Sequence, residues 1–208
     1  MPWGRVRLSP FPVLLSRSEE QIVGLRDLPY ARLQTLIRDC LCDTEDEETA
    51  ALIKRLRPAR QRGYLTAVEL EEICRWKSPR AIHYIRANTA RQIRAATLAA
   101  LKTRSERKRL ESLTSLMGVS IPMASALLML LNPKRYGVID IRVWQLMHKI
   151  GAVTKNPRGI GFTFQNWYQF LKIIRYFASK FGVSARMIEL SLFLAHRRFQ
   201  DGTLYGSS

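Results

Sequence analysis

The chain of 208 residues has only three cysteines and no long apolar run. A small, odd number of cysteines argues against a secreted domain held by disulfide bonds. No apolar stretch reaches the roughly 20 residues that a membrane-spanning helix needs, so no membrane partner is expected. Pro10 and Pro12 interrupt the apolar stretch near the N-terminus, which argues against a signal peptide. We expect a protein that is not secreted, either cytoplasmic and nucleoid-associated or nuclear.

Acidic side chains are scarce in the last two-thirds of the sequence. Residues 1–72 hold 11 basic and 12 acidic side chains, whereas residues 73–208 hold 23 basic and 5 acidic ones. The formal charge of +17 therefore comes entirely from the second part. Such an excess attracts nucleic acid, because binding releases the counterions condensed on the phosphates. A ribosome-associated or merely soluble basic protein is the alternative.

Patterns typical of strands are nearly absent. Apolar residues recur at helical spacing along almost the whole chain, which predicts an all-α protein of one domain or two closely packed lobes. Thr44, Thr66, Thr89, Ser105, Thr163 and Ser184 are candidate N-caps, and Ser18 is expected to open a further short segment. Residues 121–131 are apolar almost all round, as in a buried helix.

The most informative segment is residues 113–151. A predicted helix ends near Leu116, a tight turn follows at Gly118, and a helix rich in small residues comes next. A further helix begins at Asp140, which is one of only two acidic residues between positions 112 and 200. Two helices joined by such a hairpin form an anion site, because unpaired N–H groups and the helix dipole both favour a phosphate.

These residues resemble the helix-hairpin-helix DNA glycosylases of base excision repair, the superfamily of endonuclease III. Leu116-Met117-Gly118-Val119-Ser120 matches the family's Leu-x-Gly-Val-Gly hairpin except at its last glycine. Ala124 falls on a small-residue position of the following helix. Asp140, with Val143 three residues later, falls on the family's catalytic aspartate. The specific match covers about 35 residues, and the all-helical pattern and the distance from the hairpin to the aspartate extend it.

The resemblance implies a two-lobed fold with the helix-hairpin-helix motif at about 112–132. Residues 44–132 would form a helical barrel lobe that ends in the hairpin. Residues 1–43 and 133–208 would together form the second lobe of one compact unit. A flipped nucleotide would enter the cleft between the lobes, with Asp140 at its mouth.

The resemblance also implies a role for Asp140. Cleavage of a base–sugar bond builds positive charge on the sugar, and a nearby carboxylate stabilises that charge or orients water. The alternative is that Asp140 only caps the helix that follows it. The two roles are compatible.

Several positions depart from the family pattern. Pro122 stands where strand-cleaving members carry a lysine, so lyase activity is not expected. Ser120 replaces the second hairpin glycine, and a positive φ would be strained there. No cysteine follows Cys74, so the iron–sulfur cluster of endonuclease III is absent. No organic cofactor is implied, and a monovalent cation on the carbonyls of Met117 and Val119 is suggested by the resemblance alone.

Further candidate residues surround this segment. The hairpin residues Gly118, Val119 and Ser120 are expected to contact DNA, as are Lys134, Arg135 and Arg142. Tyr136, Trp144 and Trp76 are candidates for a base pocket, although Trp144 and Trp76 could instead pack in the core. Cys40, Cys42 and Cys74 are expected to be free cysteines far from the cleft, since no fourth ligand for zinc lies nearby.

The sequence therefore predicts a monofunctional DNA glycosylase that flips and removes a damaged base from double-stranded DNA. The chain is expected to act as a monomer. The first alternative is a helix-hairpin-helix protein that binds DNA structure without chemistry. The second is a basic RNA-binding protein, which would prefer folded RNA to duplex DNA.

Overall fold

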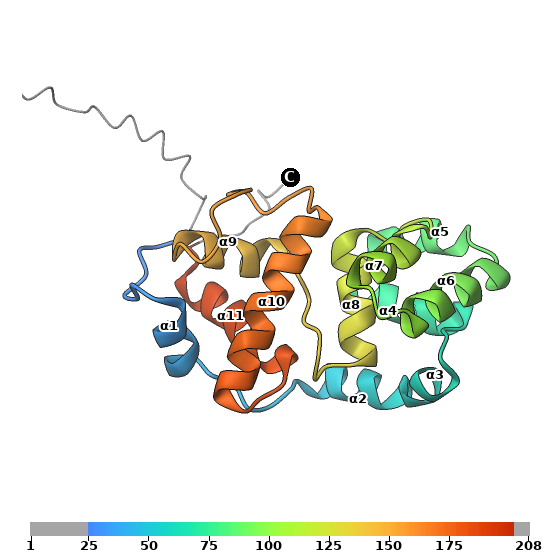
Figure 1. Cartoon of the computed structure of the whole chain (residues 1–208), viewed down its shortest axis with the longest axis horizontal. Coiled ribbons are helices and arrows are strands. Elements are labelled where there is room, and N and C mark those ends of the chain that lie inside the picture. The colour runs from blue at the N-terminus through green and yellow to red at the C-terminus, as the bar shows by residue number, and fades with distance from the viewer. Residues whose placement is uncertain (1–24, 202–208) are drawn as a thin grey trace, which may run out of the picture.

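The computed structural model describes residues 25–201, and helices dominate this part of the chain (Figure 1). The α-helices are α1 (Leu33–Asp39), α2 (Glu47–Arg55), α3 (Arg57–Arg62), α4 (Ala67–Lys77), α5 (Ile82–Arg86), α6 (Ala90–Lys102), α7 (Glu106–Thr114), α8 (Ile121–Leu131), α9 (Ile141–Lys149), α10 (Phe164–Phe181) and α11 (Ala185–Phe199). Residues 25–201 contain no strand beyond an isolated bridge between Leu25 and Gln200. The all-α prediction is therefore confirmed for these residues. The segment expected at Ser18 lies outside them.

Most helices begin where the sequence predicts an N-cap. Thr66, Thr89 and Thr163 form capping boxes, in which the side chain at the third helical position bonds back to the cap. Ser105 and Ser184 cap α7 and α11. Local hydrogen bonds of this kind depend on only four residues, so the sequence alone is enough to place them.

Three local predictions need correction. Thr44 does not cap α2, because Asp46 lies closer to the helix and accepts the Thr49 N–H at 2.9 Å. The helix before the hairpin ends at Thr114, two residues earlier than expected. Pro79, a residue type favoured at the first position of a helix, predicts an α-helix that starts there, but it opens a 3₁₀ turn, Pro79–Ala81, and the α-helix begins at Ile82.

The helices lie in two groups, which Figure 1 separates clearly. The first group holds α2 to α8, and the second holds α1, α9, α10 and α11. Two chain segments run between the groups, residues 40–46 before α2 and residues 132–140 after α8. The site described below lies where these segments meet α11.

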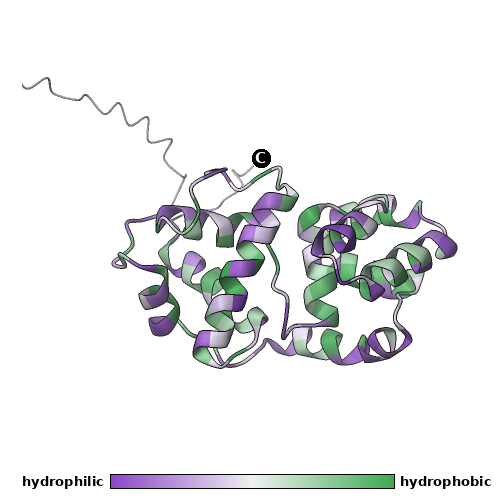
Figure 2. Ribbon diagram, viewed as in Figure 1, coloured by the Kyte–Doolittle hydropathy of each residue, from purple (hydrophilic) through white to green (hydrophobic). Residues whose placement is uncertain are grey.

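The core of the first group forms around α8. Nine of its residues, 123–131, are buried, and Figure 2 shows this helix as apolar along most of its length. The second group packs around Trp144, Trp167 and Phe170, none of which is exposed. Burying one large apolar side chain contributes about 1.5–3 kcal/mol, so these residues hold each group together.

Both connecting segments are attached to the start of α11. The Arg186 side chain bonds both carboxylate oxygens of Glu45 at 2.8 Å. The backbone N–H groups of Ala185 and Arg186 donate to the carbonyls of Lys134 and Pro133. The position of the second connection is thus set by α11, which follows it by almost 50 residues.

A second link joins the groups through Glu106 of α7. Its carboxylate accepts from Arg175 of α10 at 2.9 Å and from the Tyr136 hydroxyl at 3.1 Å. Burial alone would raise the pKa of Glu106, but Arg175 and Arg109 together lower it below its usual value. The charged form of Glu106 is therefore the one that connects α7 with α10.

Within residues 25–201, no helix combines the length and apolarity that crossing a bilayer requires.

Candidate functional site

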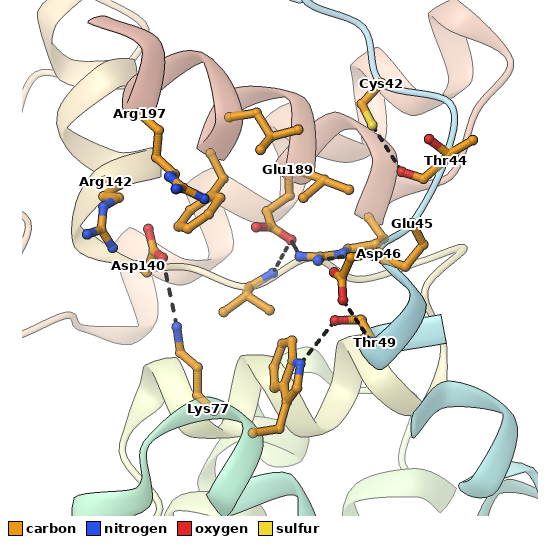
Figure 3. Close-up of a pocket in the computed structure, with 16 residues that line it drawn as sticks. Cys42, Thr44, Glu45, Asp46, Thr49, Lys77, Asp140, Arg142, Glu189 and Arg197 are labelled. Atoms are coloured by element: carbon orange, nitrogen blue, oxygen red, sulfur yellow. Dashed lines mark hydrogen bonds and ion pairs between the residues drawn. The ribbon is translucent and has the colours of Figure 1, made fainter. Parts of the chain in front are cut away.

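A cavity of about 650 Å³ lies between the two groups of helices (Figure 3). Its lining includes Asp46 and Thr49 of the α2 end, Trp76 and Lys77 of α4, and Phe193 and Arg197 of α11. Asp140 closes one end of the cavity. This volume falls within the range of roughly 300–1,000 Å³ that is common for small-molecule sites.

The two carboxylate oxygens of Asp140 have different partners. Oδ1 accepts the Val143 N–H at 3.0 Å and so caps α9. Oδ2 lies 3.8 Å from Nζ of Lys77, and the Asp140 side chain is 15% exposed. The capping role is thus observed, and it leaves the second oxygen directed at a cation from the opposite group of helices.

A second cavity, of about 580 Å³, adjoins the first on the other side of Asp140. Lys77, Asp140 and Arg142 line both cavities. The second cavity is also bordered by the hairpin and the start of α8, at residues 118 and 120–123, and by residues 159–162 of the loop before α10. Asp140 therefore stands between a space beside the hairpin and a space between the two groups.

The hairpin turn depends on Gly118. Its φ is +79°, a value that L side chains rarely adopt. A Cβ at this position would lie 2.8 Å from Cβ of Tyr84 and 3.2 Å from the backbone nitrogen of Ile85. Gly118 is thus required both by the turn and by the close approach of α5.

Ser120 adopts an ordinary extended conformation, with φ −76° and ψ 171°. The strain expected at this position is therefore absent. Its hydroxyl does not cap α8, although serine is a capping residue. Within residues 25–201, the backbone N–H groups of Ser120 and Ile121 have no hydrogen-bond partner. The start of α8 thus keeps open donors next to the second cavity.

Asn88 holds the other side of the turn. Its side-chain amide donates to the Met117 carbonyl at 3.0 Å and accepts the Met117 N–H at 2.8 Å. The Met117 carbonyl that was expected to bind a cation is therefore already bonded. The described part of the chain contains no cluster of His, Cys, Asp or Glu suited to a metal ion.

The far end of the first cavity contains a buried ionic network. Arg186 bonds Glu45 and also Glu189, whose Oε2 lies 2.5 Å from its guanidinium. Burial alone would lower the pKa of Arg186, but Glu189 and Glu45 raise it above its ordinary value. Glu189 also accepts the Val138 N–H at 3.2 Å. Because Val138 lies two residues before Asp140, this network fixes the approach of the chain to Asp140.

His196 lies behind the cavity, fully buried, and neither ring nitrogen has a partner among residues 25–201. Burial lowers its pKa to about 4, and the positive charge of Arg142 adds to this effect against the opposing influence of Asp140. His196 is therefore neutral at pH 7. The sequence offers no signal for this environment, because His196 is 56 residues from Asp140 along the chain.

Only one of the three predicted base-pocket aromatic residues lines the Asp140 cavity. Trp76 does so, and its indole N–H donates to Thr49 Oγ1 at 3.0 Å. Tyr136 is 4% exposed and points to Glu106 instead. Trp144 is fully buried, and its indole N–H donates to the Asn156 carbonyl at 2.8 Å. The structure thus places Tyr136 and Trp144 in the core, where they support other segments.

The three basic residues that were predicted to contact DNA lie in two different places on the molecule. Arg142 lines both cavities beside Asp140. Lys134 and Arg135 are exposed and border a different hollow, together with Arg175 of α10. Val119 is 5% exposed and packs in the core, so that its side chain is not available at the hairpin surface.

The three cysteines form no disulfide, as expected, but one of them lies beside the cavity that Asp140 lines. Cys74 is buried, and Cys40 and Cys42 are half-buried. Cys42 lines the cavity that contains Asp140, which corrects the prediction that all three lie far from it. Its backbone N–H donates to the Ser191 hydroxyl of α11 at 2.9 Å. The cysteine is brought there by the connecting segment of residues 40–46.

Sequence reasoning did not single out Lys77, Glu189 or Arg197 as residues of the cavity. In the sequence, Lys77 is one basic residue beside Trp76, and Glu189 is the only acidic residue besides Asp140 between positions 112 and 200. Each is far from Asp140 along the chain, with separations of about 50 to 60 residues. A rare acidic residue in a basic region is the one signal that could have directed attention to Glu189.

Comparisons with family models, with curated protein sequences and with solved structures find no match to this chain. The resemblance to helix-hairpin-helix glycosylases therefore rests on the hairpin and aspartate motifs of the sequence and on its helical pattern.

Proposed function

We propose that this chain is a monofunctional DNA glycosylase, which flips a modified base out of double-stranded DNA and hydrolyses its N-glycosidic bond. The observation that carries the proposal is the position of Asp140. Its Oδ1 is used as a helix cap, while its Oδ2 faces a junction of two cavities, one of which borders the hairpin.

The arrangement suits the charge changes of the reaction. As the bond to the base breaks, positive charge develops on the sugar, and a fixed carboxylate stabilises it. The cap holds Asp140 in one orientation, and the Lys77 ammonium keeps a positive charge beside Oδ2. In the proposed complex, the hairpin side holds the DNA backbone and the cavity between the groups receives the base.

The DNA contact draws on the open N–H groups of Ser120 and Ile121 and on the basic residues of the second cavity. Lys77, Arg80 and Arg142 line that cavity, with Asp140 as its acidic residue. Phosphates bind well to helix N-termini flanked by cations. The overall charge of +17 adds a strongly salt-dependent attraction.

Base release from duplexes that each contain one modified base tests the proposal. The abasic product is read by alkaline cleavage, with Asp140→Asn compared with the wild type. Asp39→Asn serves as the charge-matched control, because Asp39 belongs to α1 and lines neither cavity. Release by the wild type and the control, but not by Asp140→Asn, supports a glycosylase. No release from any duplex, with equal DNA binding by all three proteins, favours a protein that only binds DNA.

We also propose that the strand is not cut. Pro122 is the second residue of α8 and has no amine. Lys77 does have one, but its Nζ lies 3.8 Å from Oδ2 of Asp140 and is paired with that carboxylate. Treatment with borohydride in the presence of abasic DNA tests this expectation. A covalent adduct that disappears in Lys77→Gln would show lyase chemistry and overturn it.

A further inference from the structure

The inference concerns the kind of base that the cavity accepts, and it rests on the proposed function. Most charged groups of the cavity already have a partner of opposite sign. Lys77 faces Asp140, and Arg186 bonds both Glu45 and Glu189. In these contacts two cations compensate most of the charge of three carboxylates.

Arg142 and Arg197 differ from these groups. Neither forms an ion pair with any residue in the range 25–201, and Nε of Arg142 is buried there without a hydrogen-bond partner. Both line the cavity, and Figure 3 shows them at the same end as Asp140. The Arg142 guanidinium also lies 5.5 Å from the centre of the Phe193 ring, which orients it. Two guanidinium groups that form no ion pair among residues 25–201 thus line the same end of the cavity as Asp140.

The acceptors of the cavity are mostly occupied. Both oxygens of Glu45 accept from Arg186, and Oδ1 of Asp46 accepts the Thr49 N–H. The indole N–H of Trp76 is bonded to Thr49, so that Trp76 offers a ring surface rather than a donor. Guanidinium groups carry five N–H donors and no acceptor. The donors that remain for a ligand are therefore the guanidinium groups of Arg142 and Arg197, beside the Oδ2 atoms of Asp140 and Asp46.

We infer that the cavity accepts an uncharged base with a carbonyl-bearing acceptor edge, such as uracil, hypoxanthine or 8-oxoguanine, and rejects cationic N-alkylpurines. Arginine donors match carbonyl and ring-nitrogen acceptors, as in the common pairing of arginine with the guanine edge. A base with a fixed positive charge would instead be placed beside two cations of the same sign, which is unfavourable in a partly desolvated cavity. The Trp76 and Phe193 rings add apolar contact with either class, so they do not discriminate.

The experiment compares two classes of duplex under single-turnover conditions. One class contains uracil, hypoxanthine or 8-oxoguanine, and the other contains 7-methylguanine or 3-methyladenine. We expect the wild type to release at least one base of the first class. Every base of the second class should be released more slowly than that base. Arg142→Gln and Arg197→Gln are each expected to slow release of the first class by roughly tenfold or more, as expected for loss of one base contact.

Arg198→Gln is the matched control. Arg198 is the next residue of α11, lies over the Phe199 ring and does not line the cavity. Its replacement removes the same charge, and release by this variant should match the wild type. Equal losses in Arg197→Gln and Arg198→Gln would attribute the effect to overall charge and would overturn the inference.

The two proposals fail in different ways. Faster release of a cationic N-alkylpurine than of any uncharged base of the first class would overturn the inference and leave a glycosylase in place. Release of no base at all would overturn the proposed function, and the inference with it. Release of a carbonyl-bearing base that is unaffected by Arg142→Gln and Arg197→Gln would also contradict the assignment of these donors.

Discussion

The starts of α8 and α9 both border the cavity beside the hairpin, yet they differ in how their backbone donors are used. At α9, the Asp140 side chain accepts the Val143 N–H and so caps the helix. At α8, the Ser120 hydroxyl makes no such bond, and Pro122 removes one further donor. A helix N-terminus capped by aspartate fixes the position of a carboxylate, whereas an uncapped N-terminus leaves N–H groups available to an anion. One helix N-terminus thus positions the Asp140 carboxylate, and the other offers backbone N–H donors.

The largest expected effect comes from Asp140→Asn. Asparagine caps a helix about as well as aspartate, so stability should change by less than about 0.5 kcal/mol. The negative charge is lost, and base release should fall by about 10²–10³-fold. Single-turnover release and thermal unfolding measure the two effects. A large loss of stability with unchanged release would show that Asp140 serves α9 alone.

The buried side chain of His196 should make the stability of the protein depend on pH. Its pKa is lowered by burial to about 4, whereas an unfolded histidine titrates near 6.5. Between these values the unfolded chain binds more protons, so the free energy of unfolding should fall by up to about 3 kcal/mol as pH drops from 6.5 to 4. Replacement of the buried ring in His196→Leu should remove this dependence.

Denaturant unfolding at several pH values provides the measurement for His196. His83→Leu is the control, since His83 is exposed and its ring lies 3.8 Å from that of Tyr84, with the two planes tilted by 42°. If His83→Leu flattened the profile as much as His196→Leu, the assignment to the buried ring would be wrong.

Gly118→Ala tests the turn that precedes the uncapped N-terminus of α8. The positive φ and the contact with Tyr84 Cβ should together cost about 1–3 kcal/mol of stability. Gly151→Ala separates these two causes, because Gly151 also has a positive φ (+75°) but nothing within 4 Å of its added Cβ. Thermal unfolding of both variants should show the larger loss for Gly118→Ala. Equal losses would mean that the approach of α5 contributes nothing.

The smallest effect is expected for Ser120→Ala. Because this hydroxyl does not cap α8, its removal should change stability by less than about 0.5 kcal/mol. Ser184→Ala, which removes the bond from the Met187 N–H at 3.1 Å, should cost about 1 kcal/mol. Chemical denaturation compares the two. A cost at Ser120 as large as that at Ser184 would show that the start of α8 is capped in solution.

The sequence predicts the helices far better than the cavity. The cap at Thr66, the buried helix at 121–131 and the turn at Gly118 each depend on a few neighbouring residues. The base pocket depends on which side chains meet from distant segments. Tyr136 and Trp144 are close to Asp140 in sequence, but Glu106 and the loop carbonyl of Asn156 draw them into the core.

Helix position, helix ends and the glycine of the hairpin follow from local sequence, because apolar spacing, capping and backbone strain act over one or two turns. The sequence also marks Asp140 as an isolated acid in a basic region. Tertiary packing alone brings Lys77 to within 3.8 Å of that acid and leaves Arg197 without a counterion beside it. Such contacts depend on the packing of α4 and α11 around the connecting segments, and no short stretch of sequence contains that information.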